Sequence, residues 1–170
     1  MNFRSTDGRF GLCVPPEAVT RIAEFRRDKD PDETGGILLG RYTEDHSWGI
    51  VTTVSGPPTD SRHGPTWFHR GVRGLQGLLT RLWKANEAYY LGEWHSHPES
   101  RVTPSGTDQT QLNAISSDGG YSCPEPVLLI SGGKLVAPTM AAYVYPRDES
   151  PVQLQPTEDA PSPDDLKQDA

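Results

Sequence analysis

Apolar residues recur along the chain in two spacings, and together they predict a domain of mixed strands and helices. Short apolar or alternating runs predict strands at residues 10–14, 37–42, 48–54, 127–131 and 135–145, and a further strand that begins at residue 89. Because strands and helices are interleaved along the chain, we expect an α/β fold in which a sheet lies between helices.

The helices are indicated by apolar positions that recur every three or four residues. Four leucines in the middle of the chain fall at i, i+3, i+4 and i+7, the spacing of one helix face: Leu75, Leu78, Leu79 and Leu82. This stripe predicts packing against the core. Further helices are expected after Pro15 and from Ser105 onward. A long loop rich in glycine and proline, 55–71, precedes the leucine helix.

The composition divides the chain into two parts. The 170 residues, of which 34% are hydrophobic, are enough for one core. Residues 147–170 are different: they contain four prolines and seven acids against only Arg147 and Lys167, and so carry −5 of the net charge of −7. Such a segment buries too little apolar surface to offset the entropy of ordering. We therefore expect one domain at 1–146 and a disordered acidic tail at 147–170.

Charge and cysteine content narrow the class of protein. The chain before the tail is close to neutral and has no basic stripe, so nucleic-acid binding is not expected. Cys13 and Cys123 are far apart, which makes a disulfide framework or a cysteine zinc knuckle unexpected. There is neither a signal-peptide core near the start nor an apolar run of about 18 residues. We expect a soluble, cytoplasmic protein with no membrane contact.

The segment that begins at His95 carries the strongest chemical signal. It reads His-Ser-His-Pro and is followed by Ser105 and Asp108. Two histidines at i and i+2 on a strand point to the same face, and a carboxylate on the next helix can complete a tetrahedral metal site. Three such ligands leave a fourth position open for water, as in catalytic zinc sites. Ser105 and Asp108 also have the spacing of a helix capping box, a feature compatible with the metal site.

Upstream of this segment, Glu33 is followed by Thr34 and then by the apolar stretch Gly-Gly-Ile-Leu-Leu-Gly. Hydrolysis at zinc needs a general base, and a carboxylate that is not itself a ligand suits that task. The glycines after Glu33 allow the backbone to approach the metal site or a substrate closely. Glu93 is a competing candidate for the base, because strand alternation puts it on the same face as His95 and His97. Its other expected role is to accept a hydrogen bond from a ligand histidine.

These motifs together resemble the JAMM, or MPN+, metalloprotease family, over roughly residues 9–146. The resemblance implies an α/β MPN (JAB) fold, a curved mixed β-sheet flanked by helices. It also implies one Zn²⁺ per chain, bound by His95, His97 and Asp108. Glu33 would then be the catalytic acid/base, and Ser105 would be catalytic by hydrogen bonding to the oxyanion.

The family resemblance also implies a substrate. Its members cleave ubiquitin or ubiquitin-like proteins from lysines, and the short chain resembles the bacterial deconjugating proteases of ubiquitin-like and CBASS anti-phage operons. The expected partner is the C-terminal tail of a ubiquitin-like protein, or its conjugates, added as a strand beside the sheet. Three alternatives remain: a peptidase that trims a ubiquitin-like or sulfur-carrier precursor, a RadC-like DNA-associated protein, and an inactive MPN scaffold.

Several residues outside the motifs are weaker candidates. In the long loop, Arg62, His69 and Arg70 are candidates for substrate contact, although the substrate-binding residues are not defined by the sequence. Trp67 and Trp94 are expected to be packing residues. Neither the oligomeric state nor the need for a partner follows from the sequence.

Overall fold

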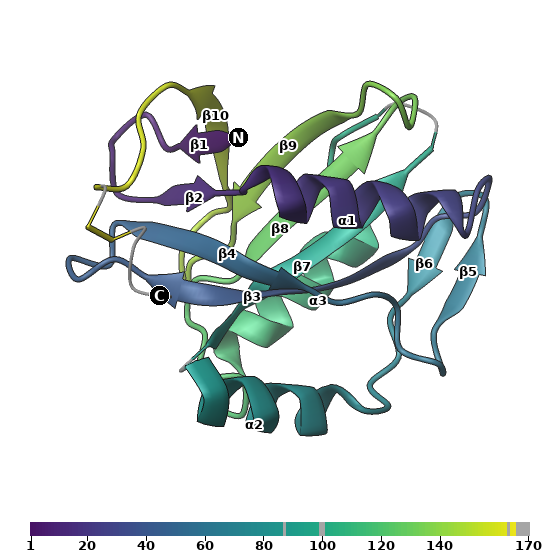
Figure 1. The fold of residues 1–170 in the computed structure, drawn as a ribbon, viewed down its shortest axis with the longest axis horizontal. Coiled ribbons are helices and arrows are strands. Elements are labelled where there is room, and N and C mark those ends of the chain that lie inside the picture. The colour runs from purple at the N-terminus through teal and green to yellow at the C-terminus, as the bar shows by residue number, and fades with distance from the viewer. Residues whose placement is uncertain (87, 99–100, 163, 166–170) are drawn as a thin grey trace.

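The computed structural model describes residues 1–86, 88–98, 101–162 and 164–165, and its centre is one closed mixed sheet (Figure 1). In spatial order, the strands of this sheet are β1 (Asn2–Arg4), β10 (Val152–Thr157), β9 (Thr139–Val144), β8 (Val127–Gly132), β7 (Tyr89–His97), β3 (Gly35–Tyr42), β4 (Trp48–Val54) and β2 (Gly11–Cys13). A separate two-stranded sheet joins β5 (Arg62–Gly64) to β6 (Trp67–His69).

Closure of the sheet modifies the expected architecture. The sequence predicted a curved sheet flanked by helices, and the mixed sheet and helices are present. However, β1 pairs with both β2 and β10, which joins the two edges that an open sheet would leave exposed. The β7–β8 and β2–β4 pairs are parallel, whereas the other pairs of this sheet are antiparallel. Neither β1 nor β10 was predicted from the sequence.

The helices cover the sheet on different sides. They are α1 (Pro16–Arg27), α2 (Leu75–Asn86) and α3 (Gly106–Ser117). Leu129 of β8 shares a core cluster with Ile22 of α1, whereas its neighbours Leu128 and Ile130 share another with Leu112 of α3. Because alternate residues of a strand face opposite sides, α1 and α3 pack on opposite faces of the central strands, as Figure 1 shows.

The leucine helix α2 is more peripheral than its stripe suggested. Its leucines are half-buried and pack against Ile37, Leu39 and Tyr90. Beside them lies a groove of about 730 Å³, and Trp83, on the rim of this groove, is 48% exposed. The periodicity therefore identified the helix and its contact face correctly, but the contact covers the outside of the sheet. No helix in the described part of the chain has both the length and the apolar character needed to cross a bilayer.

The expected disorder of residues 147–170 is wrong for the part that forms β10. Val152, Gln153 and Leu154 pair with β9, while residues 155–157 pair with β1. Leu154 is 1% exposed and belongs to the same cluster as Leu12 and Val144. Backbone pairing on both sides and one buried leucine stabilise a segment whose composition alone predicted disorder. The expectation for residues 163 and 166–170 concerns positions outside the described residues.

Substituting Leu154 with alanine is expected to destabilise the protein by about 2–5 kcal/mol, because it leaves a cavity in the closed sheet. The measurement is chemical denaturation followed by circular dichroism. Gln155→Ala, on the neighbouring exposed position, is the matched control and should change stability by no more than about 0.5 kcal/mol. Equal, negligible effects of the two substitutions would show that β10 does not contribute to the fold.

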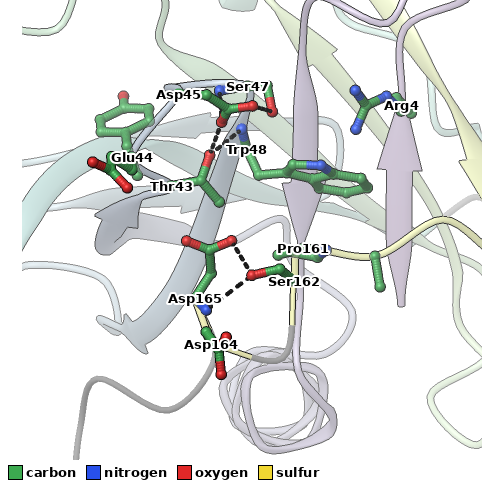
Figure 2. A pocket seen from close by; sticks show the side chains of 12 residues that line it. Arg4, Thr43, Glu44, Asp45, Ser47, Trp48, Pro161, Ser162, Asp164 and Asp165 are labelled. Atoms are coloured by element: carbon green, nitrogen blue, oxygen red, sulfur yellow. Dashed lines mark hydrogen bonds between the residues drawn. The ribbon is translucent and has the colours of Figure 1, made fainter.

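Residues that follow β10 line a cavity of about 1080 Å³ with the turn between β3 and β4 (Figure 2). Ser162 Oγ donates to Asp165 at 2.7 Å on one side of it, and Arg4 and Trp48 lie on the other. None of the site residues expected from the sequence lines this cavity. The described part of the acidic segment thus contributes β10 to the sheet, and the residues after β10 lie beside the turn between β3 and β4.

Candidate functional site

Strand β7 carries the two histidines of the expected metal site. It lies between β3 and β8, and His95 pairs with Gly35 on one side and with Ile130 on the other. His95 is buried, and so is Glu93 two residues before it, whereas Trp94 points to the opposite face and belongs to the core around α1. The predicted alternation is thus confirmed from Glu93 to His97, and Trp94 is confirmed as a packing residue.

Helix α3 positions Ser105 and Asp108. Ser105 is the N-cap residue, and its hydroxyl accepts the N–H of Asp108 at 3.2 Å. In return, the N–H of Ser105 donates to Oδ2 of Asp108 at 2.7 Å. This is the reciprocal capping box that the spacing predicted. It fixes the carboxylate of Asp108 in the first turn of the helix, where the residue is 6% exposed.

The structure brings His95, His97 and Asp108 together. Nδ1 of His95 lies 2.7 Å from Oδ1 of Asp108, and Nε2 of His97 lies 3.9 Å from Oδ2 of the same carboxylate. Nδ1 of His97 donates to the carbonyl of Arg101 at 2.8 Å, which leaves its Nε2 facing the carboxylate. One ring nitrogen of each histidine on β7 therefore lies close to the carboxylate that α3 provides.

The electrostatics of the His95 and Asp108 pair reflect this proximity. Burial on its own would lower the pKa of His95, but hydrogen bonds and charge from Asp108 and Glu93 outweigh it and raise the pKa to about 9. Burial would likewise raise the pKa of Asp108, but His95 and the capping interactions of Ser105 lower it to about 2. The two side chains thus favour opposite charges, and each stabilises the charged form of the other.

The donor set suits zinc, although the present spacing is tighter than a zinc site. Within the described residues, no three His, Cys, Asp or Glu side chains form a group ready to hold a metal ion. Bonds of about 2.0–2.2 Å would put neighbouring ligand atoms of a tetrahedral site about 3.3–3.6 Å apart. The 2.7 Å contact between His95 and Asp108 must therefore widen, and the 3.9 Å separation from His97 must shorten slightly. Imidazole and carboxylate are nevertheless the ligand types that catalytic zinc uses.

Glu33 lies immediately before β3, close to the histidine strand. Its N–H donates to the carbonyl of Gly64 at 2.8 Å, and its carbonyl accepts from Nδ1 of His63 at 3.0 Å, so the β5–β6 hairpin holds its backbone. The following residue, Thr34, exchanges two hydrogen bonds with Ser96, which lies between the two histidines. The half-buried Glu33 is therefore fixed next to the strand that carries His95 and His97.

The glycine after Thr34 is required by close packing, as the sequence suggested. A methyl group on Gly35 would lie 2.8 Å from Cδ2 of His95 and would also collide with the backbone of Trp94. Phe68 of β6 completes this contact by packing edge-on against the ring of His95. Only a residue without a side chain lets β3 pass this close to the histidine.

Residues that the motifs did not identify surround Glu93. Arg70 forms a buried ion pair with it at 2.7 Å, and Gln111 of α3 donates to its other oxygen at 2.7 Å. The hydroxyl of Tyr90 donates at 3.3 Å. Gln111 could have been identified from the sequence as a neighbour of the site, since it lies three residues after Asp108 on the same helix face. Arg70 was considered only for substrate contact, and its buried ion pair with Glu93 was not predicted.

Tyr90 reaches Glu93 because the strand alternation breaks at Gly92. This glycine has φ +148°, and the pairing of β3 with β7 shifts register between Leu38 and Leu39. Leu91 consequently packs on the side of Trp94, and Tyr90 faces the side of Glu93. Strict alternation from His95 would have assigned these two residues to the opposite faces.

The remaining loop candidates are exposed. Arg62 and His69, at opposite positions of the β5–β6 hairpin, border a surface cavity of about 620 Å³ together with Trp67. Trp67 is 50% exposed, and its indole ring packs against Gly64, so it is a packing residue only in part. Residues 99 and 100, within the loop between β7 and α3, lie outside the described residues.

The chain is similar to a known protein family and to several named bacterial proteins. Residues 15–145 match the model of the family Prok-JAB, the prokaryotic homologues of the JAB domain. A protein of Enterobacter hormaechei subsp. hoffmannii (strain UCI 50), named CD-NTase/cGAS isopeptidase, is 43% identical over 91% of this chain and 86% of its own length. A protein of the same name from Vibrio cholerae serotype O1 (strain ATCC 39315 / El Tor Inaba N16961) is 34% identical over 72% of this chain and 77% of its own.

A solved structure is similar in fold. The solution structure of a protein from Desulfitobacterium hafniense superposes with a TM-score of 0.62 at 19% sequence identity, and the match covers 85% of this chain and 90% of that one. At this identity the likeness concerns the fold alone.

Proposed function

The chain belongs to the prokaryotic homologues of the JAB domain, and from this we propose that it is a zinc-dependent isopeptidase that releases a conjugated protein from lysine side chains. The observation that carries the proposal is the meeting of His95, His97 and Asp108 beside the N-cap residue Ser105. The two histidines lie on strand β7, and Asp108 and Ser105 lie at the start of helix α3. Regular elements hold catalytic groups more precisely than loops do.

The three side chains would hold the zinc ion. His97 presents Nε2 while its other nitrogen is fixed by a backbone carbonyl, and His95 presents Nδ1 toward Asp108. A bound zinc ion supplies Lewis-acid chemistry, because it lowers the pKa of water to about 7 and polarises a carbonyl group. With three protein ligands, one position is left for water or substrate.

Glu33 and Ser105 would carry out the proton transfer and the stabilisation of developing charge. The carboxylate of Glu33 accepts a proton from the attacking water and delivers it to the leaving lysine amine. The hydroxyl of Ser105 accepts the N–H of Asp108, so its own proton is available to donate to the carbonyl oxygen as negative charge develops there. The capping box thus positions the hydroxyl of Ser105 and the carboxylate of Asp108 in the same helical turn.

The names of the relatives support a particular conjugated protein. Four similar proteins are named CD-NTase/cGAS isopeptidase. The proposed substrate is therefore a CD-NTase/cGAS protein joined through its C-terminus to lysines, in place of the ubiquitin-like protein suggested by the family resemblance. This assigns the chain to the CBASS type of bacterial anti-phage defence, in which it would reverse the conjugation.

A defined cleavage assay tests the proposal. One substrate is a bacterial CD-NTase/cGAS protein whose C-terminal carboxyl is joined to the lysine ε-amine of a peptide, and a second carries the same peptide through an ordinary α-peptide bond. We expect cleavage of the first, lost on treatment with 1,10-phenanthroline and restored by added zinc. Cleavage of only the linear substrate would indicate a processing peptidase, and cleavage that survives chelation would contradict the zinc mechanism.

Removing the hydroxyl of Ser105 is expected to lower kcat about 100- to 1,000-fold while zinc remains bound. Glycine is the suitable replacement, because it costs a helix N-cap only a few tenths of a kcal/mol. Ser105→Thr retains both the cap and the hydroxyl and is the matched control. The comparison uses kcat, zinc content and melting temperature of the two variants. If both variants retained full activity, Ser105 would serve only as a cap.

A further inference from the structure

Glu93 lies beside the site and accepts several side-chain hydrogen bonds, although the proposed chemistry does not use it. Its side chain is fully buried between β7, α3 and the segment that follows β6. Oε1 accepts from Nε of Arg70 at 2.7 Å and from the hydroxyl of Tyr90 at 3.3 Å. Oε2 accepts from Nε2 of Gln111 at 2.7 Å. Three different parts of the chain therefore hold one carboxylate in place.

This environment makes Glu93 a fixed, neutralised group. The guanidinium of Arg70 is itself buried, and it donates hydrogen bonds to the carbonyl of Gly71 and, at 3.2 Å, to the hydroxyl of Tyr121. Its charge compensates that of the carboxylate, so the pair adds no net charge to the site. A carboxylate whose two oxygens already accept strong hydrogen bonds is poorly suited to shuttle protons. The alternative of Glu93 as general base is therefore disfavoured.

The remaining neighbour of Glu93 is His95. Nε2 of His95 lies 3.4 Å from Oε2 of Glu93, while Nδ1, across the ring, faces Asp108. The imidazole is thus held between two carboxylates, one on each nitrogen. His97 is held in a similar way, but by the uncharged carbonyl of Arg101.

We propose that Glu93, held by Arg70 and Gln111, is a positioning residue that orients the ring of His95 so that Nδ1 faces Asp108. The inference rests on the proposed function, because an oriented imidazole matters here for holding zinc. Histidines that bind metals commonly donate their second N–H to a carboxylate or carbonyl, and loss of that acceptor typically weakens metal binding about 10- to 100-fold. In this chain the acceptor comes from the strand that carries the ligand, and Arg70 prevents it from adding charge.

The test compares zinc affinity in three variants. Glu93→Gln keeps the shape but places an amide where a carboxylate oxygen accepted, and we expect its Kd for Zn²⁺ to rise about 10- to 100-fold. Gln111→Leu removes one donor to Glu93 without touching Arg70, and a smaller rise is expected. Gln109→Leu, at an exposed position of the same helix, is the control and should leave the Kd unchanged. Competition with a chelator of known affinity provides the measurement, and Gln111→Leu remains informative if Glu93→Gln does not fold.

Two further readouts separate positioning from other roles. At saturating zinc, kcat of Glu93→Gln should return close to the original value, whereas a general base would lose kcat at every zinc concentration. In the zinc-free protein, the ring nitrogen chemical shifts of His95, measured on ¹⁵N-histidine-labelled samples, should change in Glu93→Gln and not in Gln109→Leu. A lower melting temperature with an unchanged zinc Kd would show a merely structural role and overturn the inference.

Failure of the proposed function can be distinguished from failure of this inference. If the original protein binds zinc and the Glu93 and Gln111 variants bind it equally well, the positioning role is wrong and the zinc mechanism stands. If the original protein binds no zinc, the proposed function is wrong, and the nitrogen shifts of His95 still decide whether Glu93 orients the ring.

Discussion

Glu33→Gln is expected to cleave the isopeptide substrate about 100- to 10,000-fold more slowly than the original protein while keeping its zinc. Glutamine has nearly the size of glutamate but cannot take a proton from water at neutral pH. Glu33 lies outside the group formed by His95, His97 and Asp108, and its backbone is held by hydrogen bonds to Gly64 and His63 that the substitution leaves intact. The loss should therefore fall on kcat and not on metal content.

The experiment measures kcat and zinc content on the same preparation. Asp32→Asn, which removes the neighbouring half-buried carboxylate, is the matched control and should retain activity near that of the original protein. If Glu33→Gln stayed active while Glu93→Gln was inactive at saturating zinc, the proton transfer would have to be reassigned to Glu93, and the positioning role would be wrong as well.

Asp108→Ala is expected to lose both bound zinc and measurable activity. The substitution removes one of three proposed ligands, and the two histidines alone cannot complete a catalytic zinc site. It also removes the carboxylate that faces His95 at 2.7 Å and accepts the N–H of Ser105 at 2.7 Å. Loss of the cap interaction should cost about 0.5–2 kcal/mol of stability in addition.

Asp108→Asn separates the two contributions of this residue. The amide oxygen of asparagine can still accept the N–H of Ser105, so the helix cap and the stability should be largely retained. A neutral amide is a much weaker zinc ligand than a carboxylate, so zinc and activity should still be lost. The measurements are metal content after dialysis, kcat and melting temperature, with Asp118→Asn at the exposed C-cap as control. Full zinc occupancy in Asp108→Asn would exclude Asp108 as a ligand.

The sequence predicted those parts of the site that are encoded locally. His95 and His97 are two residues apart on one strand, and Ser105 and Asp108 fall within one helical turn, so short-range geometry fixes each pair. Only the meeting of the two pairs depends on tertiary structure. The ligand types suggested that meeting, and the resemblance to a known family assigned the three residues to one zinc site. Gly35 was also identified, because a missing side chain before a buried strand indicates close approach.

The parts that were missed depend on contacts between distant segments. Arg70 is a polar residue at the end of a loop, and nothing in its neighbours indicates that it is buried against Glu93. The change of face at Gly92 follows from pairing with β3, which local alternation cannot reveal. β10 has one fully buried leucine, Leu154, and its remaining support comes from backbone pairing with β1 and β9. Composition measures apolar content, and it therefore underestimates a strand stabilised mainly by its neighbours.

The pairing of β1 with β10 has a consequence for biosynthesis. Asn2 lies opposite Thr157, so the sheet cannot close until residue 157 has left the ribosome. Until then, the growing polypeptide exposes the unpaired backbone edges of β1 and β9, which are templates for association with other chains. Contacts of such long sequence separation also slow folding, because the entropy of closing the loop is lost before the contacts form. Nascent chains that stall before residue 152 would therefore keep both edges exposed and be prone to associate with one another.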